Sequence, residues 1–115
     1  MGNKVVHFEV TGKDGTALQK FYSGLFDWKL DTNNPDNYGM VDTGVEGAIG
    51  GGIGQAPEGS AGLVTFYVET NDINRCLKEA ESLGGSIVMP RTEMGVVTIG
   101  MFSDPEGHVV GLVES

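Results

Sequence analysis

The chain ends in the sequence MFSDPEGHVVGLVE, which runs from Met101 to Glu114. The segment Asp104–Gly107 is typical of a turn, because aspartate can accept hydrogen bonds from nearby backbone, proline fixes φ and glycine tolerates positive φ. One apolar run enters this turn and another leaves it, which predicts a β-hairpin. Side-chain alternation puts Gly111 on one face of the second strand and Leu112 on the other. The hairpin therefore closes a sheet with a glycine in the middle of one face.

The same strand pattern occurs twice, at VVHFEV in residues 5–10 and at LVTFYV in residues 63–68, an offset of 63 − 5 = 58. In the first copy, Val6, Phe8 and Val10 share one face, and Val5, His7 and Glu9 share the other. An internal repeat of this kind changes the fold prediction, because each copy is expected to form one structural unit.

An amphipathic helix is predicted after each copy of the strand. The first helix is capped by Asp14 or Thr16, with Thr16 and Gln19 fitting a capping box, and ends near Asp27. The second is capped by Asn71 or Asp72 and stops at residues 84–85, both glycine. The remaining predicted strands cover residues 28–32, 38–45, 48–55, 86–90, 96–103 and 108–114.

The predicted fold class is therefore α+β, with two βαβββ modules in one domain covering residues 1–115. Module one spans about residues 4–55 and module two about residues 63–115. Residues 56–62 form the most linker-like segment of the chain. One helix covers only one face of each sheet, so the other faces need each other or a partner chain.

Charge and hydropathy exclude several functional classes. The chain has 16 acidic and 7 basic residues and a net charge of −9, which repels nucleic-acid phosphates. No apolar run approaches the roughly 20 residues that a membrane-spanning helix needs. The first four residues lead directly into a strand pattern, so no signal peptide is expected and a cytoplasmic location is the default. The single cysteine, Cys76, falls in an amphipathic helix, where a buried and unreactive thiol is expected.

Three segments resemble the vicinal oxygen chelate superfamily, which includes glyoxalase I, bleomycin-resistance proteins, extradiol dioxygenases and methylmalonyl-CoA epimerase. They are the opening VHFEV of residues 6–10, the helix end at residues 21–28, and the closing FSDPEGHVVGLVE of residues 102–114. The resemblance covers essentially the whole chain. It implies that the two modules' sheets form an open cup with the helices outside, that ligands bind in the cup, and that the protein is a homodimer.

The resemblance also implies where a divalent metal (Zn, Ni, Mn or Fe) would bind. Enzymes of the superfamily hold it with His, Gln or Glu on the first and last strands of each module. His7 occupies one such position, but its counterpart is Thr65 and the last-strand position of module two is Gly111. The fourth position lies within Gly47–Gly54, whose glycine, alanine and isoleucine residues cannot ligate a metal. A metal is therefore not expected.

Some alternatives remain open around His7. A site of His7, Glu9 and Glu69 would rescue metal binding. Without a metal, His7 could be hydrogen-bonded to a neighbouring carboxylate or backbone group, contact a ligand, or act as a general acid or base. His108 follows the turn and is interpreted as a turn-stabilising residue. No catalytic residue is assigned.

Aromatic and methionine side chains are expected to line the cup, where they offer an adaptable apolar surface. Met94 and Phe102 belong to this set. The ligand-binding residues predicted from the sequence are His7, Glu9, Tyr38, Met40, Thr65, Tyr67, Met89, Met101 and Gly111. The same apolar residues could instead pack between the sheets or across a dimer interface. Gly50–Gly54 lacks the Lys-Ser/Thr ending of a phosphate loop and indicates close backbone approach, at a subunit contact or over a flat ligand.

The sequence favours a metal-independent protein that binds a small apolar or aromatic molecule. The alternative is a divalent-metal-dependent lyase, isomerase or dioxygenase of the same superfamily, and a third hypothesis is an accessory domain without a ligand.

Overall fold

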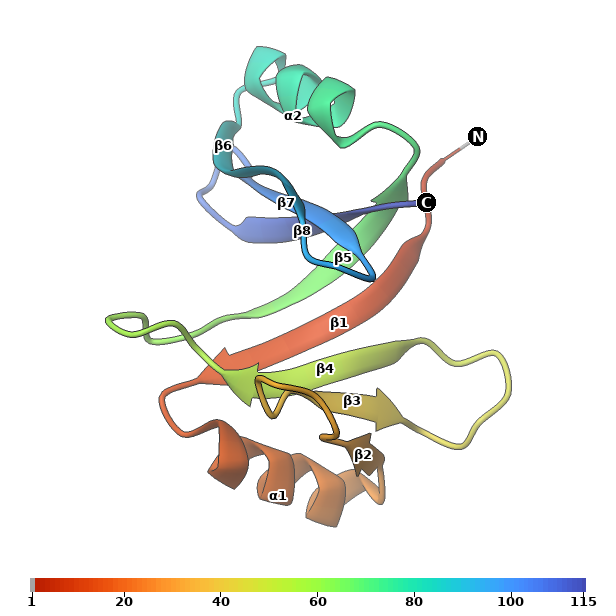
Figure 1. The fold of residues 1–115 in the computed structure, drawn as a ribbon. Coiled ribbons are helices and arrows are strands. Elements are labelled where there is room, and N and C mark those ends of the chain that lie inside the picture. Colours follow the sequence, from red (N-terminus) through yellow and green to blue (C-terminus); the bar gives the residue numbers. More distant parts are fainter. Residues whose placement is uncertain (1) are drawn as a thin grey trace. The chain divides into compact units, whose positions relative to one another are not determined.

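The computed structural model describes residues 2–115, in which two helices and eight strands follow the order βαβββ twice (Figure 1). Module one comprises β1 (Val5–Gly12), α1 (Gly15–Phe26), β2 (Lys29–Asp31), β3 (Gly39–Asp42) and β4 (Gly50–Gln55). Module two comprises β5 (Val64–Thr70), α2 (Ile73–Ser82), β6 (Ser86–Glu93), β7 (Thr98–Ser103) and β8 (Val109–Glu114). One compact unit is His7–Val64, and the other combines Thr65–Ser115 with the residues up to Val6. The predicted paired βαβββ repeat is confirmed.

In module one the strands lie in the order β2-β3-β4-β1. Strand β1 runs parallel to β4, and β3 runs antiparallel to both β2 and β4. Glu9 lies opposite Gly52, and Met40 lies opposite Gly52 on its other side. These pairings give the register of the glycine-rich strand, which the sequence left open, and place Gly52 opposite Glu9.

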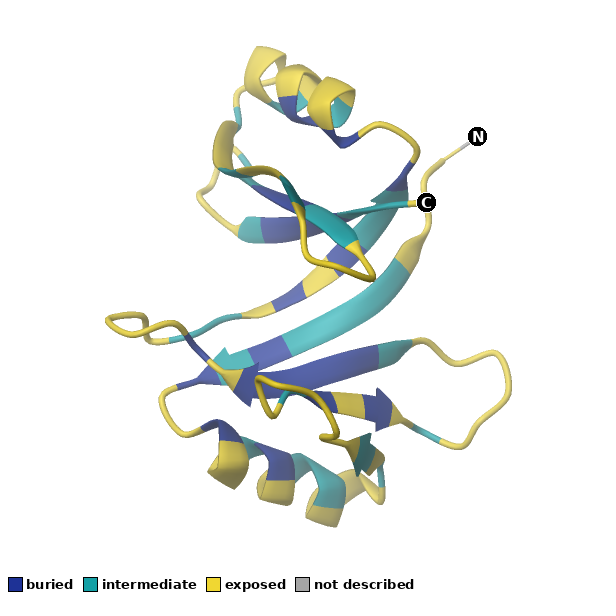
Figure 2. Cartoon of the chain, viewed as in Figure 1, coloured by how far each residue is buried: buried dark blue, intermediate teal, exposed yellow. Residues whose placement is uncertain are grey.

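The core of module one lies between its sheet and α1. Val10, Val41 and Ile53 are buried there, with Phe8 and Tyr22 packed against them. The alternation predicted for the first strand is confirmed at residues 7–10, because Phe8 and Val10 meet this core while His7 and Glu9 contact Tyr38 instead. Figure 2 shows the same division, with most of β4 buried and much of the outer surface of α1 exposed.

Helix α1 begins at the cap Asp14, whose Oδ1 accepts a hydrogen bond from Ala17 N at 3.0 Å. It ends at Asp27, which has a left-handed φ of 59°. The predicted capping box was wrong: the Gln19 side chain is buried and points away from the helix start. Its Nε2 donates to the carbonyl oxygens of Asn37 and Ile53, at 2.9 and 2.8 Å. Gln19 thus joins α1 to the loop before β3 and to β4.

In module two the strands lie in the order β5-β8-β7-β6. The predicted hairpin is confirmed as the antiparallel pair β7–β8, joined by a turn in which Asp104 Oδ1 accepts from the backbone N–H groups of Glu106 and His108. Strand β8 also runs parallel to β5, with Tyr67 opposite Gly111. Each module therefore pairs its first and last strands in parallel.

The core of module two is formed by Ile73, Leu77 and Leu112 under α2. Phe102 packs against this core, so its predicted place with the ligand-binding residues was wrong. Adjacent residues of a strand face opposite sides, so Phe102 and Met101 cannot both line the same face. Met94 was also misplaced, because it follows β6 in a loop and is 55% exposed.

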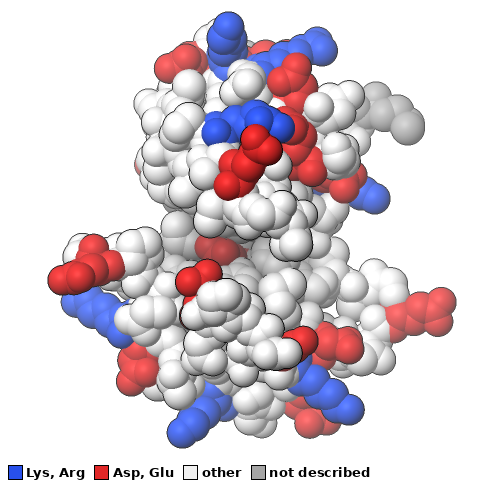
Figure 3. All heavy atoms as spheres, in the orientation of Figure 1, with Lys and Arg blue, Asp and Glu red and all other residues white. Residues whose placement is uncertain are grey.

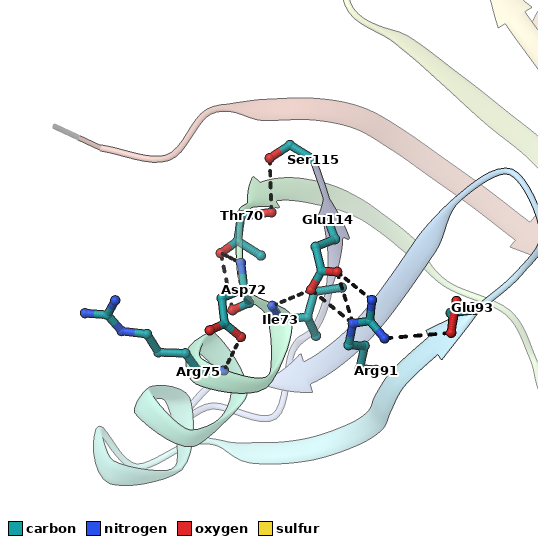
Figure 4. Close-up of polar contacts among 8 residues, drawn as sticks. All are labelled: Thr70, Asp72, Ile73, Arg75, Arg91, Glu93, Glu114 and Ser115. Carbon is teal, nitrogen blue, oxygen red and sulfur yellow. Dashed lines mark hydrogen bonds and ion pairs between the residues drawn. The ribbon is translucent and has the colours of Figure 1, made fainter.

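The start of α2 is tied to the last strand of its own sheet (Figure 4). Asp72 Oδ1 caps the helix by accepting from Arg75 N at 3.1 Å. Glu114 Oε2 accepts from Ile73 N at 3.0 Å, and its Oε1 accepts from Arg91 Nη2 at 2.8 Å. The sequence predicted that Pro90 marks either an edge strand or a strand end. Strand β6, which carries Arg91, is an edge strand and continues past Pro90 with an irregular register.

Candidate functional site

A hydrogen-bonded group of three side chains lies on the face of the module-one sheet turned away from α1. The Tyr38 hydroxyl donates to Glu9 Oε2 at 2.8 Å and lies 3.1 Å from His7 Nε2. Because the phenol proton points to Glu9, a hydrogen bond between Tyr38 and His7 requires the tautomer of His7 that carries its proton on Nε2. Burial lowers the pKa of His7, which favours the neutral imidazole.

The Tyr38 ring reaches this position by crossing β4 over glycine. A Cβ at Gly52 would lie 1.7 Å from the Tyr38 hydroxyl, and a Cβ at Gly54 would lie 3.0 Å from its Cδ1. On the opposite face, a Cβ at Gly51 would lie 2.4 Å from the Phe8 ring. The groups that approach the glycine-rich strand closely are two rings of the same module, whereas the sequence predicted a subunit contact or a flat ligand.

Module two has the same arrangement at Gly111. A Cβ there would lie 2.5 Å from two ring carbons of Tyr67, which is buried. The repeat offset maps Glu9 onto Tyr67, since 9 + 58 = 67, and these residues lie opposite Gly52 and Gly111 respectively. Gly52 and Gly111 are thus equivalent positions of the two last strands, and a tyrosine ring covers each one.

The residues present do not fit the divalent ion that the superfamily resemblance implies. Gly52 and Gly111 have no ligating atoms, and a longer side chain at either position would collide with a tyrosine ring. The Thr65 hydroxyl donates to Val109 O at 2.6 Å. Within residues 2–115, no three His, Cys, Asp or Glu side chains are grouped as a metal site. His7 is the one remaining residue of the four expected positions.

The structure brings most of the predicted site residues into one row in each module. In module one, Met40 lies opposite Gly52, which lies opposite Glu9. In module two, the row of opposed residues is Met89, Met101, Gly111 and Tyr67. Met101 and Tyr67 are buried, Met89 is half-buried and Met40 is 47% exposed. The module-one row combines methionine, glycine and glutamate, and the module-two row combines methionine, glycine and tyrosine.

Two contributors to the site were missed by sequence reasoning. Asn34 pairs with the backbone of Tyr38 through both its Oδ1 and its Nδ2, at 2.8 and 2.7 Å. Gly52 provides the space for the ring. The asparagine-rich turn at residues 33–37 was a signal for the first, because asparagine side chains often bond nearby backbone. Nothing local marked Gly52, since its role depends on strand register.

Two other residues were not predicted to belong to the site, and one of them, Cys76, is half-buried where the sequence predicted a buried thiol. Burial raises the pKa of Cys76, as does the nearby Glu79 carboxylate, so the thiolate is disfavoured. His108 Nδ1 lies 3.0 Å from Asp104 Oδ2 within the β7–β8 turn, in agreement with its interpretation as a turn residue. On the face drawn in Figure 3, basic side chains are scattered among acidic ones and form no stripe.

Comparison with known families gives the evolutionary relationship. A sequence model of the Glyoxalase/Bleomycin resistance protein/Dioxygenase superfamily matches residues 4–112. The chain belongs to this superfamily. CFP32 of Mycobacterium tuberculosis, named as a candidate glyoxylase, is 30% identical over 106 residues, which cover 86% of this chain and 41% of CFP32. The anthracycline biosynthesis protein DauV of Streptomyces sp. is 26% identical over 117 residues, which cover 87% of this chain and 42% of DauV. The chain thus spans about two fifths of the length of these superfamily relatives.

Solved structures of superfamily members share the fold. A superfamily member from Vibrio splendidus has a TM-score of 0.65 and 17% identity, and covers 99% of this chain and 100% of its own. Methylmalonyl-CoA epimerase from Streptomyces coelicolor has a TM-score of 0.67 and 18% identity, and covers 97% of this chain and 94% of its own. At these identities the likeness supports the fold and leaves the chemistry to the residues of each protein. No helix within residues 2–115 is long and apolar enough to cross a membrane.

Proposed function

We propose that this superfamily member binds a small, flat, apolar or aromatic molecule without a metal ion. The main observation that supports this proposal is that two positions on the last strands, Gly52 and Gly111, lack a side chain and are covered by tyrosine rings. A carboxylate at either position would have to displace a ring that the module already packs. At both positions a tyrosine ring therefore occupies the place where a metal enzyme of this fold needs a metal-ligating side chain.

The chemistry of the two rows supports a flat ligand. Methionine side chains adapt to apolar shapes, and tyrosine adds both a ring face and a hydroxyl. The net charge of −9 favours neutral or cationic molecules by electrostatic steering. DauV, one of the relatives, is named for anthracycline biosynthesis, and anthracyclines are flat polycyclic aromatics. An anthracycline is therefore a reasonable first probe.

The proposal includes a homodimer. Each relative is more than twice as long as the part that matches, which leaves room for a second domain of this size. A homodimer of the present chain would contain as many modules as a relative built from two such domains. Multi-angle light scattering tests this directly, and a mass of one chain across the micromolar range would contradict it.

Metal analysis separates this proposal from the metal-dependent lyase, isomerase or dioxygenase, which the name of CFP32 and the presence of His7 favour. The protein is purified without metal-chelating resin, and bound Zn, Ni, Mn and Fe are measured before and after loading. We expect less than stoichiometric metal and no change in melting temperature with a chelator. One metal per chain that is lost in His7→Ala would overturn the proposal.

Ligand binding is tested by thermal shift and fluorescence with an anthracycline and with 2-naphthol. A ligand that binds only the folded state stabilises it by RT ln(1 + [L]/Kd), so the melting temperature should continue to rise with ligand concentration above Kd. Stabilisation by either compound supports the proposal. No stabilisation by any compound of an aromatic and cationic panel would favour the accessory domain without a ligand.

A further inference from the structure

A small polar cavity lies within module one, where the start of α1, the loop before β3 and the end of β4 meet. Its volume is about 80 Å³. The residues that line it are Gly15, Thr16, Gln19, Asp36, Asn37 and Gln55. None of them belongs to the rows of opposed residues that contain Gly52 and Gly111. The cavity is therefore separate from the residues proposed to bind an aromatic ligand.

The start of α1 is fixed against the end of β4, so the cavity has defined walls. Gln55 Oε1 accepts a hydrogen bond from Gly15 N at 2.8 Å, and Gln55 Nε2 donates to Lys13 O at 2.6 Å. A Cβ at Gly15 would lie 2.6 Å from Gln55 N, so the helix start packs directly on the strand end. Both ends of the Gln55 amide are thus used to hold one wall to the other.

The buried amide of Gln19 presents an oxygen to this cavity. Gln19 is only 7% exposed, and its Nε2 donates to the carbonyl oxygens of Asn37 and Ile53, which fixes the orientation of the amide. Within residues 2–115, Gln19 Oε1 accepts no hydrogen bond, yet no side-chain oxygen or nitrogen that is closed off from solvent lacks a partner. Gln19 Oε1 must therefore be reached from outside, and Gln19 lines the cavity.

The cavity offers several oxygen atoms and no cationic side chain. The lining residues add the hydroxyl of Thr16, the carboxylate of Asp36 and the amide of Asn37 to Gln19 Oε1. In the part of the chain that the structure describes, no lysine or arginine lines the cavity, which argues against an anionic ligand at this helix start. Carboxylate, amide and hydroxyl oxygens are the ligands that hard cations prefer.

The charge of the lining favours a monovalent over a divalent cation. Asp36 is the one acidic residue of the six, so a divalent ion would keep one positive charge without a partner. The start of a helix also carries partial positive charge, which disfavours a second positive charge further. Here that partial charge is reduced, because Gly15 N and Ala17 N donate to the side chains of Gln55 and Asp14. A single positive charge is the one that Asp36 can balance.

We propose that this cavity binds sodium or potassium through Gln19 Oε1, the Asp36 carboxylate and the Thr16 hydroxyl, with water completing the coordination. The ion joins α1 to the loop at residues 33–37. That loop leads directly to Tyr38, whose ring covers Gly52, so the ion stabilises the segment that carries the ring. The inference does not depend on the proposed aromatic ligand, and a chelator of divalent metals does not test it.

The melting temperature in different chloride salts tests the proposal. The protein is unfolded by heat in potassium chloride, sodium chloride and choline chloride at equal concentration and followed by circular dichroism. Choline has the same charge, but its methyl groups keep oxygen ligands away from its nitrogen. At about ten times Kd, we expect potassium or sodium to raise the melting temperature by about 5 °C relative to choline.

Two conservative variants connect this rise to the cavity. Asp36→Asn removes the charge but keeps an oxygen, and Thr16→Val removes the hydroxyl but keeps the shape. We expect each variant to reduce the rise to less than half of its value in the unaltered chain. The controls are Glu58→Gln, which removes one exposed carboxylate elsewhere in module one, and Thr32→Val, which removes an exposed hydroxyl. Neither control residue lines the cavity, so both should keep the full rise.

Crystals grown with thallium(I) acetate locate the ion, because thallium(I) carries the charge of potassium and scatters anomalously. We expect an anomalous peak at coordination distance from Gln19 Oε1 and the Asp36 carboxylate. Equal melting temperatures in the three salts would overturn the proposal. A rise of the same size in both variants and both controls would also overturn it, since that is a general salt effect. A water molecule at Gln19 Oε1 with no thallium peak would do the same.

Discussion

The replacement Gly111→Ala gives the most direct test of the glycine–tyrosine packing in module two. The new Cβ would lie 2.5 Å from two carbons of the Tyr67 ring and 2.7 Å from its Cγ, well inside ordinary contact distance. Tyr67 is only 7% exposed, so the ring has little space to retreat. Overpacking of this kind costs about 1–3 kcal/mol, and alanine in a strand recovers about 0.5–1 kcal/mol. We expect a net loss of about 1–2 kcal/mol.

That loss corresponds to a fall of about 4–8 °C in melting temperature for a chain of this size. Thermal and urea unfolding followed by circular dichroism measure it, and Gly24→Ala serves as the control because a Cβ there has no neighbour within 4 Å. In a Tyr67→Leu background, Gly111→Ala should cost little, because the ring that opposes it is gone. An equal loss in both backgrounds, or none in the unaltered chain, would refute the packing argument.

Three further predictions concern titration and buried hydrogen bonds. Burial lowers the folded-state pKa of His7, so the unfolded chain binds more protons than the folded chain. The free energy of unfolding should therefore fall as pH drops through about 6.5 and below. In urea titrations from pH 8 to 5, His7→Gln should make this free energy less dependent on pH. Hydrogen bonds from Arg91 and from Ile73 N lower the pKa of Glu114. The stability that Glu114 contributes is therefore present above its unfolded-state pKa and is lost as pH falls. Glu114→Gln should reduce the melting temperature at pH 7 but not near pH 2. Gln19→Met leaves two carbonyl oxygens without their amide donor and should cost about 2–4 kcal/mol in urea unfolding, whereas exposed Thr16→Ala should cost less than about 1 kcal/mol.

The fold was predictable because its signals are local. The caps Asp14 and Asp72, the Asp104–Gly107 turn and the alternation in the first and last strands each act over a few residues. The repeat then assembled these elements into two modules, and the superfamily match over residues 4–112 agrees with that order. Propensity and pattern carry such information because the same residues would favour the same element in many proteins.

The candidate site was less predictable because its contacts depend on register. Thr16 and Gln19 have the spacing of a capping box, yet tertiary contacts take the Gln19 amide to two carbonyls of other elements. Phe102 and Met101 are both apolar, and only the pairing of β7 with β8 shows which one faces α2. The sequence predicted methionine and tyrosine as ligand-binding residues, but it could not show which glycine lies under which ring.

In both modules a tyrosine ring covers a glycine of the last strand, but the tyrosine comes from a different element in each module. Tyr38 covers Gly52 from a loop before the neighbouring strand β3, whereas Tyr67 covers Gly111 from β5, the strand opposite. If these positions simply tolerated glycine, we would expect empty space over them. Since a ring fills each one, glycine and tyrosine form a unit: a ligating side chain could occupy either position only if the covering ring were removed. A metal-ligating side chain at either position and the tyrosine ring that covers it therefore exclude each other.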